Sequence, residues 1–209
     1  TLLVEQTGKI KGKRRLSGYY SAFSRLFCFF SNLDLWVQDY VQIINNPWLV
    51  KIMIIITYMG SPWIFIILSA LTSSYLWSKG KKLETIFLNV TLFSTWGIME
   101  GLKHLFKYAR PAGQALTMAR GYSFPSGHAM LSLAFYGFLA ALLLKYGGRG
   151  NKQVWLGAVA LYILVLLIGL SRIYLNVHYL SDVMAGFLFG ILILILSLNA
   201  MKLVQNHRL

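Results

Sequence analysis

The stretch QVWLGAVALYILVLLIGLS, residues Gln153–Ser171, decides the fold class of this chain. It is an apolar run without a single charged side chain, and about 20 such residues are what an α-helix needs to cross the hydrocarbon core of a bilayer. A polar pair, Ser171-Arg172, stands at its end. The run therefore predicts a membrane-spanning helix with a polar border.

Four further apolar stretches flank this run, three before it and one after it. They lack the alternation with period two that is typical of membrane β-barrels. The sequence therefore predicts an all-α, polytopic transmembrane helical bundle. The predicted spans are Ile52–Trp77, Leu83–Leu102, Ser126–Tyr146, Gln153–Ser171 and Leu180–Met201. The triplet Gly60-Ser61-Pro62 predicts a kink or a break inside the first of them.

The composition agrees with a membrane protein. The 209 residues are 57% hydrophobic and only 12% charged, whereas soluble domains carry roughly 25% charged residues. The length allows one domain, which we expect at residues 33–209 after a basic and aromatic segment at 1–32. The net charge of +14 suits anionic lipid or cytoplasmic loops. Nucleic-acid binding is disfavoured, because the basic residues are divided among loops on both faces.

The N-terminal segment allows two interpretations. Gly8–Arg15 is a basic run, and Leu16–Phe30 is a short aromatic stretch interrupted by Arg25. The stretch is either an interfacial helix with its basic residues on lipid headgroups or a short sixth span. The basic run favours a crossing, whereas Arg25 and the short length favour a helix that lies flat.

The short loops between the predicted spans indicate an orientation. Their basic clusters fall on one face when the crossings are counted, and the positive-inside rule makes that face cytoplasmic, together with the C-terminus. The clusters are Lys79, Lys81 and Lys82, then Lys145, Arg149 and Lys152, then Lys202 and Arg208. The connections Lys103–Pro125 and Arg172–Tyr179 then face away from the cytoplasm. We expect a multi-pass protein of the cell membrane.

Three polar islands lie in or beside these two connections. They are Lys103-x6-Arg110-Pro111, Pro125-Ser126-Gly127-His128 and Ser171-Arg172-x5-His178-x3-Asp182. Each has an ordinary explanation by itself, as snorkelling cations, a capped helix start or a local ion pair. On one membrane face they amount to a site for phosphoryl transfer, which needs mainly positioning and cations around the phosphoryl oxygens.

The two histidines suit different roles in such a site. His178 and Asp182 are four residues apart at the head of the last span and are expected to share a helical face. The carboxylate can then accept a hydrogen bond from one imidazole nitrogen and leave the other as a nucleophile. His128 lies in the first turn of a helix whose start, Ser126-Gly127, suits an anion. It is placed to protonate a leaving oxygen.

Three cations complete the expected site. Lys103 and Arg110 are seven residues apart and share a face if their helix continues beyond the membrane until Pro111 stops it. Arg172 is the third, and arginine can grip phosphate oxygens in a bidentate manner. Hard cations such as Mg²⁺ are usually bound by several carboxylates. The connections predicted to face away from the cytoplasm contain no acidic cluster. We therefore expect neither a metal nor a cofactor.

The order of the islands resembles the type 2 phosphatidic acid phosphatase (PAP2) superfamily, which also includes vanadium haloperoxidases and glucose-6-phosphatase. Every motif position is matched, and the resemblance covers about residues 33–201. It implies that His178 attacks phosphorus to form a phosphohistidine, that Asp182 orients it and that His128 protonates the leaving alkoxide. The phosphate-binding residues that it implies are Lys103, Arg110, Ser126, Gly127 and Arg172. Membrane members commonly have six spans, a pattern from which this N-terminus departs.

We therefore expect a metal-independent phosphoric ester or anhydride hydrolase. Its substrate would be a lipid phosphate or pyrophosphate at the extracytoplasmic face, such as phosphatidate, phosphatidylglycerol phosphate or an isoprenyl pyrophosphate. Its other partners are membrane lipids, with no obligate protein partner evident. A phosphotransferase with the same phosphohistidine remains an alternative. A non-catalytic anion-binding or transport protein is the other, although a transporter should show paired broken helices and one break is evident here.

Overall fold

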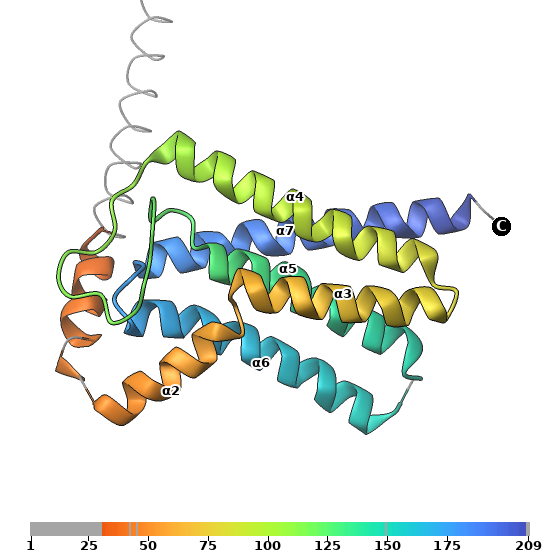
Figure 1. Ribbon diagram of the computed structural model, residues 1–209, viewed down its shortest axis with the longest axis horizontal. Coiled ribbons are helices and arrows are strands. Elements are labelled where there is room, and N and C mark those ends of the chain that lie inside the picture. Colours follow the sequence, from red (N-terminus) through yellow and green to blue (C-terminus); the bar gives the residue numbers. More distant parts are fainter. Residues whose placement is uncertain (1–30, 42, 45, 149, 208–209) are drawn as a thin grey trace, which may run out of the picture.

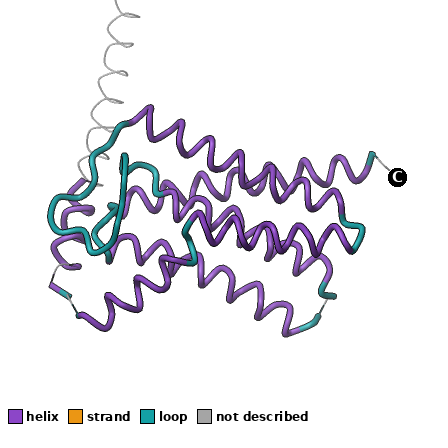
Figure 2. The backbone as a smooth tube through the Cα atoms, in the orientation of Figure 1, coloured by secondary structure: helices purple, strands orange, loops and turns teal. Residues whose placement is uncertain are grey.

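The computed structural model describes residues 31–41, 43–44, 46–148 and 150–207, and helices are the only regular elements in those ranges (Figures 1 and 2). The prediction of an all-α chain is confirmed. The alternatives for the N-terminal segment fall almost entirely outside the described residues.

Six labelled helices follow a helical segment at residues 31–41. They are α2 (Pro47–Tyr58), α3 (Pro62–Ser78), α4 (Lys82–Phe106), α5 (Gly127–Tyr146), α6 (Lys152–Tyr174) and α7 (Leu180–Asn206). Helix α5 lies at the centre and contacts α4, α6 and α7 (Figure 1). The loop between α4 and α5 and the connection between α6 and α7 lie at one end of the bundle, opposite the C-terminus.

Burial of α5 explains its central place. Most of its side chains are buried, and Met130, Phe135 and Phe138 are fully enclosed by the neighbouring helices. Glycines on α7 permit the close approach: a Cβ atom on Gly186 would lie 2.7 Å from the carbonyl oxygen of Ser126, and one on Gly190 would lie 2.8 Å from that of Met130. The start of α5 is therefore fixed against α7 by backbone proximity.

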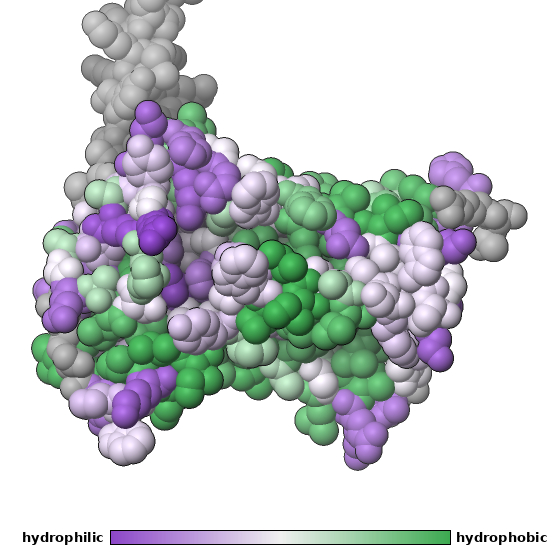
Figure 3. All heavy atoms as spheres, viewed as in Figure 1, coloured by the Kyte–Doolittle hydropathy of each residue, from purple (hydrophilic) through white to green (hydrophobic). Residues whose placement is uncertain are grey.

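Only some of the described helices are long and apolar enough to cross a membrane. By length and composition α5, α6 and α7 can each cross a bilayer, and α2 with α3 forms a further candidate bent by 44°. The bend lies between Tyr58 and Pro62, which confirms the break predicted at Gly60-Ser61-Pro62. An apolar band separates two more polar ends on the face shown in Figure 3.

Helix α4 does not meet the same criterion. Polar side chains such as Glu84, Asn89 and Glu100 interrupt its apolar sequence, although it is long enough to cross. The predicted number of five spans is thus not confirmed. What the described part of the chain supports is an all-helical membrane protein with three candidate spans, or four with the bent pair.

Candidate active site

The three polar islands meet at the end of the bundle that carries the α4–α5 loop. They come from separate elements, and direct contacts join Arg110 to His178 and His178 to Asp182. The members are Lys103 at the end of α4, Arg110 in the loop, His128 at the start of α5, Arg172 at the end of α6, His178 between α6 and α7, and Asp182 in the first turn of α7.

His178 and Asp182 form a buried pair. Their side chains are 2% and 0% exposed, and His178 Nδ1 lies 3.4 Å from Asp182 Oδ2. Helix α7 begins at Leu180, so the two residues do not share a helical face as expected. Instead, the Asp182 carboxylate turns back over the helix start and also accepts the backbone N–H of Tyr179 at 2.9 Å. The helix start therefore brings the pair together.

Arg110 shows which nitrogen of His178 carries the lone pair. Its Nη1 lies 3.3 Å from His178 Nε2, and because a guanidinium can only donate, Nε2 must accept. The proton of the neutral ring is then on Nδ1, facing Asp182. Burial lowers the pKa of His178 to about 4; the hydrogen bond to Asp182 opposes this shift, and the charges of Arg110 and Arg172 add to it. The imidazole is neutral at pH 7, with Nε2 available as a nucleophile.

Arg110 reaches the site from a loop. Helix α4 ends at Phe106, and Lys107 adopts a left-handed φ of 48°, so the helix does not continue to Arg110 as the spacing suggested. All three guanidinium nitrogens donate to backbone carbonyl oxygens. The acceptors are Arg120 at 2.8 Å, Gly121 at 3.0 Å, Tyr122 at 3.3 Å and Val177 at 2.7 Å. The loop thus holds this cation rigidly beside His178.

Arg172 is 3% exposed, and among the described lysines and arginines it is the one that is buried. Its Nη1 donates to the Thr57 hydroxyl on α2 at 2.7 Å, while its Nε has no hydrogen-bond partner. The break after α2 also lies close to the site, since a Cβ atom on Gly60 would be 3.1 Å from His128 Cδ2. The bent pair α2–α3 therefore supports the site, a role that the sequence did not indicate for Thr57.

Ser126 and Gly127 stand at the start of α5 as predicted. Ser126 is the N-cap residue, yet its side chain makes no capping bond, and its buried hydroxyl has no partner. A Cβ atom on Gly127 would collide with the sulfur of Met99 on α4. A side chain at Gly127 would therefore have to displace the flexible end of Met99, so helix packing favours a glycine here.

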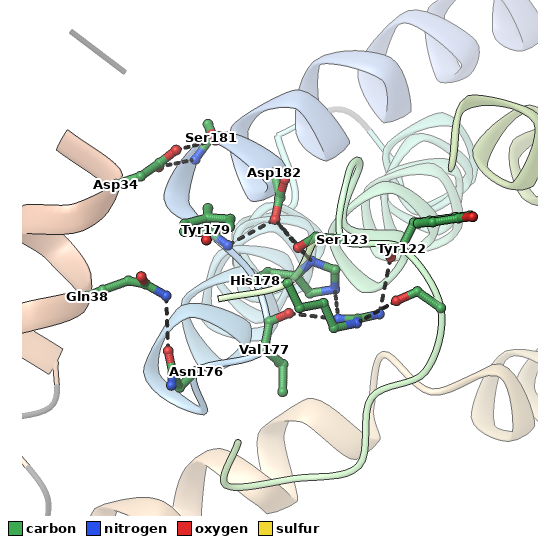
Figure 4. Close-up of polar contacts among 12 residues, drawn as sticks. Asp34, Gln38, Tyr122, Ser123, Asn176, Val177, His178, Tyr179, Ser181 and Asp182 are labelled. Atoms are coloured by element: carbon green, nitrogen blue, oxygen red, sulfur yellow. Dashed lines mark hydrogen bonds and ion pairs between the residues drawn. The ribbon is translucent and has the colours of Figure 1, made fainter. Parts of the chain in front are cut away.

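Ser123 is a site residue that the sequence analysis missed. Its hydroxyl donates to Asp182 Oδ2 at 2.5 Å and lies 3.3 Å from His178 Nδ1 (Figure 4). It lies three residues before Ser126, just outside the second island. Inspecting the residues that flank each island would have nominated it, but nothing in the sequence tells which side chain faces the histidine.

A second set of missed residues ties the helical segment 31–41 to the site. Asp34 accepts the backbone N–H and the hydroxyl of Ser181 at 2.9 and 2.6 Å, and Gln38 donates to Asn176 at 3.1 Å (Figure 4). Asn176 has a left-handed φ of 55°, and its amide also donates to two carbonyl oxygens of the α4–α5 loop. These contacts fix the chain on both sides of His178.

No group of three or more His, Cys, Asp and Glu residues in the described ranges is arranged to hold a metal ion. The positive charge at this end comes from side chains. Four buried side-chain atoms of the described residues lack a partner, and all but Ser132 Oγ belong to the three islands. The other three are Ser126 Oγ, Arg172 Nε and Asp182 Oδ1. Such atoms are costly in a folded protein unless a ligand or water satisfies them. Ser126 Oγ and Arg172 Nε can donate and therefore suit an anionic ligand, whereas Asp182 Oδ1 accepts and needs a donor such as water.

Fold and site together define a helical membrane protein with cations gathered around a histidine–aspartate pair. The chain belongs to the PAP2 superfamily, whose model matches residues 84–205, and it is a membrane enzyme of the PAP2 phosphatase type, a hydrolase. The matched range contains all three islands and lies within the predicted domain 33–209.

Two curated relatives are similar to the chain. Phosphatidylglycerophosphatase B of Bacillus subtilis is 27% identical over 175 residues, which is 84% of this chain and 86% of the relative. Sphingosine-1-phosphate phosphatase 1 of Rattus norvegicus is 36% identical over 109 residues, which is 50% of this chain but 25% of that protein.

Two solved structures share the fold. The transmembrane PAP2-type phosphatidylglycerolphosphate phosphatase of Bacillus subtilis superposes with a TM-score of 0.76 at 25% identity, covering 85% of this chain and 94% of that one. LpxE of Aquifex aeolicus superposes with a TM-score of 0.64 at 25% identity, covering 79% and 94%. The helical arrangement around the site is thus that of membrane PAP2 phosphatases.

Proposed function

We propose that this protein hydrolyses a lipid phosphomonoester or pyrophosphate through a phosphohistidine at His178. The observation that carries the proposal is the state of the buried imidazole. Its Nε2 lone pair faces the Arg110 guanidinium, while its Nδ1 proton faces the Asp182 carboxylate. A neutral histidine with an oriented lone pair among cations is suited to attack phosphorus.

The first step forms one bond and breaks another. His178 Nε2 bonds to phosphorus as the bond from phosphorus to the lipid oxygen breaks, and His128 gives that oxygen a proton when the leaving group is an alkoxide. The Nδ1 proton stays in place, and Asp182 balances the positive charge of the ring. In the second step water attacks phosphorus and gives a proton to His128, while the bond from phosphorus to His178 Nε2 breaks. Inorganic phosphate leaves, and the His178 ring becomes neutral again.

The cations are placed to stabilise the phosphoryl oxygens during both steps. Arg110 already uses every guanidinium nitrogen, and one of its contacts is with His178 Nε2. A phosphoryl group on Nε2 would replace that contact with a bond to a phosphoryl oxygen. Arg172 Nε and Ser126 Oγ, which lack partners, are further donors for the same group. Lys103 adds a point charge.

A lipid is the substrate class that we favour. An apolar cavity of about 260 Å³ lies between α3 and α4, and Leu131, one turn beyond His128, contributes to its wall. Its other lining residues are Pro62, Phe65, Ile66, Ser69, Asn89, Leu92, Phe93 and Trp96. An acyl or prenyl chain fits such a surface. The names of the relatives, phosphatidylglycerophosphatase and sphingosine-1-phosphate phosphatase, support the same substrate class.

We further propose that the site faces away from the cytoplasm. The basic loops that the positive-inside rule assigns to the cytoplasm include Lys79–Lys82, between α3 and α4, and Lys152, after α5. In Figure 1 both connections lie at the end opposite the α4–α5 loop. A site at that other end would meet lipid headgroups of the outer leaflet.

An activity panel tests the proposal. Purified protein in detergent with EDTA is offered phosphatidate, phosphatidylglycerol phosphate and an isoprenyl pyrophosphate, and free phosphate is measured with and without a lipid or sugar acceptor. We expect acceptor-independent phosphate release, inhibition by vanadate and an acid-labile phosphoenzyme in quenched samples. Phosphate that appears only on the acceptor would support the phosphotransferase alternative. Absence of turnover on every substrate would overturn the proposed activity.

A further inference from the structure

The hydroxyl of Ser123 lies between the two members of the buried pair. It is 2.5 Å from Asp182 Oδ2 and 3.3 Å from His178 Nδ1, whereas the direct distance from the histidine to the carboxylate is 3.4 Å. The short contact of the carboxylate is therefore with a serine and not with the imidazole. Figure 4 shows the three side chains converging at the start of α7.

The hydrogen bonds around Asp182 are concentrated on one oxygen. Oδ2 receives the Ser123 hydroxyl and the backbone N–H of Tyr179 and faces His178 Nδ1, while Oδ1 has no partner. The single Ser123 proton points to Oδ2, so an oxygen lone pair of the hydroxyl is left for Nδ1–H. The imidazole proton thus has two acceptors, the carboxylate and the serine oxygen.

The position of Ser123 does not depend on its own side chain. Its backbone N–H donates to the carbonyl oxygen of Tyr108 at 2.8 Å, and the backbone N–H of Ser126 donates to the carbonyl oxygen of Asp182 at 3.0 Å. The first bond holds Ser123 to another part of the α4–α5 loop, and the second holds Ser126 against the start of α7. Replacing the hydroxyl should leave the backbone in place and remove only the contacts with Asp182 and His178.

We propose that Ser123 is a positioning residue of the phosphoryl-transfer site, whose hydroxyl holds the Asp182 carboxylate and steadies the Nδ1 proton of His178. This inference rests on the function proposed above. When Nε2 bonds to phosphorus, the ring becomes cationic and its Nδ1–H turns fully to Oδ2. Ser123 keeps its own proton throughout and acts only by fixing the acceptor, so its contribution belongs to the transition state.

The test compares three substitutions of Ser123. Ser123→Ala removes the hydroxyl, Ser123→Cys fills the space with a weak donor, and Ser123→Thr retains the hydroxyl. We expect kcat and the single-turnover rate of phosphoenzyme formation to fall by about tenfold to a hundredfold in the Ala and Cys variants, because a hydrogen bond to a charged group is lost. KM should change less than about twofold, and Thr should restore most of the rate.

A double-mutant cycle separates positioning from mere packing. If Ser123 acts through Asp182, Ser123→Ala should cost less than about threefold in an Asp182→Asn background, measured under single-turnover conditions with excess enzyme. Ser197→Ala is the matched control. Ser197 lies on α7 and shares a hydroxyl hydrogen bond with Thr91 on α4, away from the site, and its loss should leave kcat unchanged.

The outcomes distinguish this inference from the proposed function. A wild-type protein that turns over no lipid phosphate overturns both. An active wild type with unchanged kcat in Ser123→Ala or Ser123→Cys overturns the role of Ser123 alone. Full additivity with Asp182→Asn, or an equal loss in Ser197→Ala, also overturns that role. Rates are compared only among variants whose melting temperatures match that of the wild type. A loss of kcat that Ser123→Thr does not restore assigns Ser123 to packing and overturns the role.

Discussion

The two ends of the helical bundle both carry a buried carboxylate, yet they are built differently. At the end opposite the site, Glu84 at the start of α4 accepts hydrogen bonds from Lys145 at 3.0 Å, from Gln205 at 3.0 Å and from the hydroxyl of Tyr146. These donors come from α5 and α7. The cluster therefore ties three helices together and balances the negative charge of Glu84 with a lysine.

At the site end the charges are not balanced and some polar atoms lack hydrogen-bond partners. Asp182 is outnumbered by three nearby cations, and one of its oxygens has no partner, in common with Ser126 Oγ and Arg172 Nε. A satisfied polar cluster stabilises a fold, whereas an unsatisfied one costs free energy and persists where function requires it. The contrast suggests that the Glu84 cluster serves the fold and that the His178 end is completed by substrate.

The largest expected effect comes from removing the nucleophile. His178→Asn should lower phosphatase activity by about a thousandfold or more, since only background catalysis by the remaining groups is left. The melting temperature should change little. The matched control is His207→Asn at the opposite end, next to the end of α7, which should keep full activity. Retention of more than a tenth of the activity by His178→Asn would rule out the phosphohistidine.

A smaller loss is expected when the buried cation keeps its charge but loses its shape. Arg172→Lys should lower kcat/KM by about a hundredfold, because a lysine cannot reach both Thr57 and a phosphoryl oxygen in the geometry of a guanidinium. Vanadate should also bind more weakly. Lys145→Arg, the equivalent exchange in the Glu84 cluster, serves as control and should leave kcat/KM within about twofold. Equal effects of the two exchanges would erase the proposed difference between the ends.

The Glu84 cluster should respond in stability instead of activity. Glu84→Gln removes the negative charge that faces Lys145 and weakens three hydrogen bonds, so the free energy of unfolding should fall by about 2 kcal/mol. Specific activity at a temperature well below melting should stay unchanged. Thermal unfolding in detergent and phosphate release provide the two measurements. A loss of activity without a change in melting temperature would show that this cluster communicates with the site.

The pH dependence of stability offers a test of the buried histidine. The pKa of His178 is lowered to about 4 in the folded protein, against about 6.5 for an unfolded histidine. Between these values the unfolded state binds more protons, so the contribution of His178 to stability is present above pH 6.5 and is lost as the pH falls towards 4. The slope of melting temperature against pH in this window should be shallower in His178→Asn. Identical slopes would contradict the neutral state of the imidazole.

The smallest effect is expected where the segment 31–41 is tied to the site. Asn176→Gly keeps the left-handed backbone but removes the hydrogen bonds to Gln38 and to the α4–α5 loop, so kcat/KM should fall by about threefold. Asn176→Ala removes the same bonds and strains the backbone, which should lower stability by about a further 1 kcal/mol. If the two variants behaved alike in thermal unfolding, the left-handed conformation would not matter.

Much of the fold followed from local sequence. Apolar runs of sufficient length specify helices in a membrane, and Gly60-Ser61-Pro62 specifies a break because proline cannot continue a hydrogen-bonded helix. The polar side chains of α4 marked the limit of this reasoning. A helix that packs against α3, α5 and α7 can carry Glu84 and Asn89 on its inner faces, so its hydropathy does not reveal its place in the bundle.

Most members of the candidate site were predictable, with Ser123 and Thr57 as exceptions, but its geometry was not. The motifs nominated His178, Asp182 and the cations, and the structure brings them together at one end. The helical relation assumed between Lys103 and Arg110 does not exist, since α4 ends before Arg110. Contacts between residues far apart in the chain, such as Arg172 with Thr57, depend on how helices pack and leave no local pattern to read.

The sequence by itself determined that this protein is helical, that it belongs in a membrane and which side chains are candidates for its chemistry, because hydropathy, breakers and motif residues act locally. Only the tertiary structure decided which nitrogen of His178 presents a lone pair, how Arg110 is held by backbone carbonyl oxygens and that Ser123 stands between His178 and Asp182. Those facts depend on the directions of hydrogen bonds between separate segments. Such directions are fixed only when the helices pack around α5.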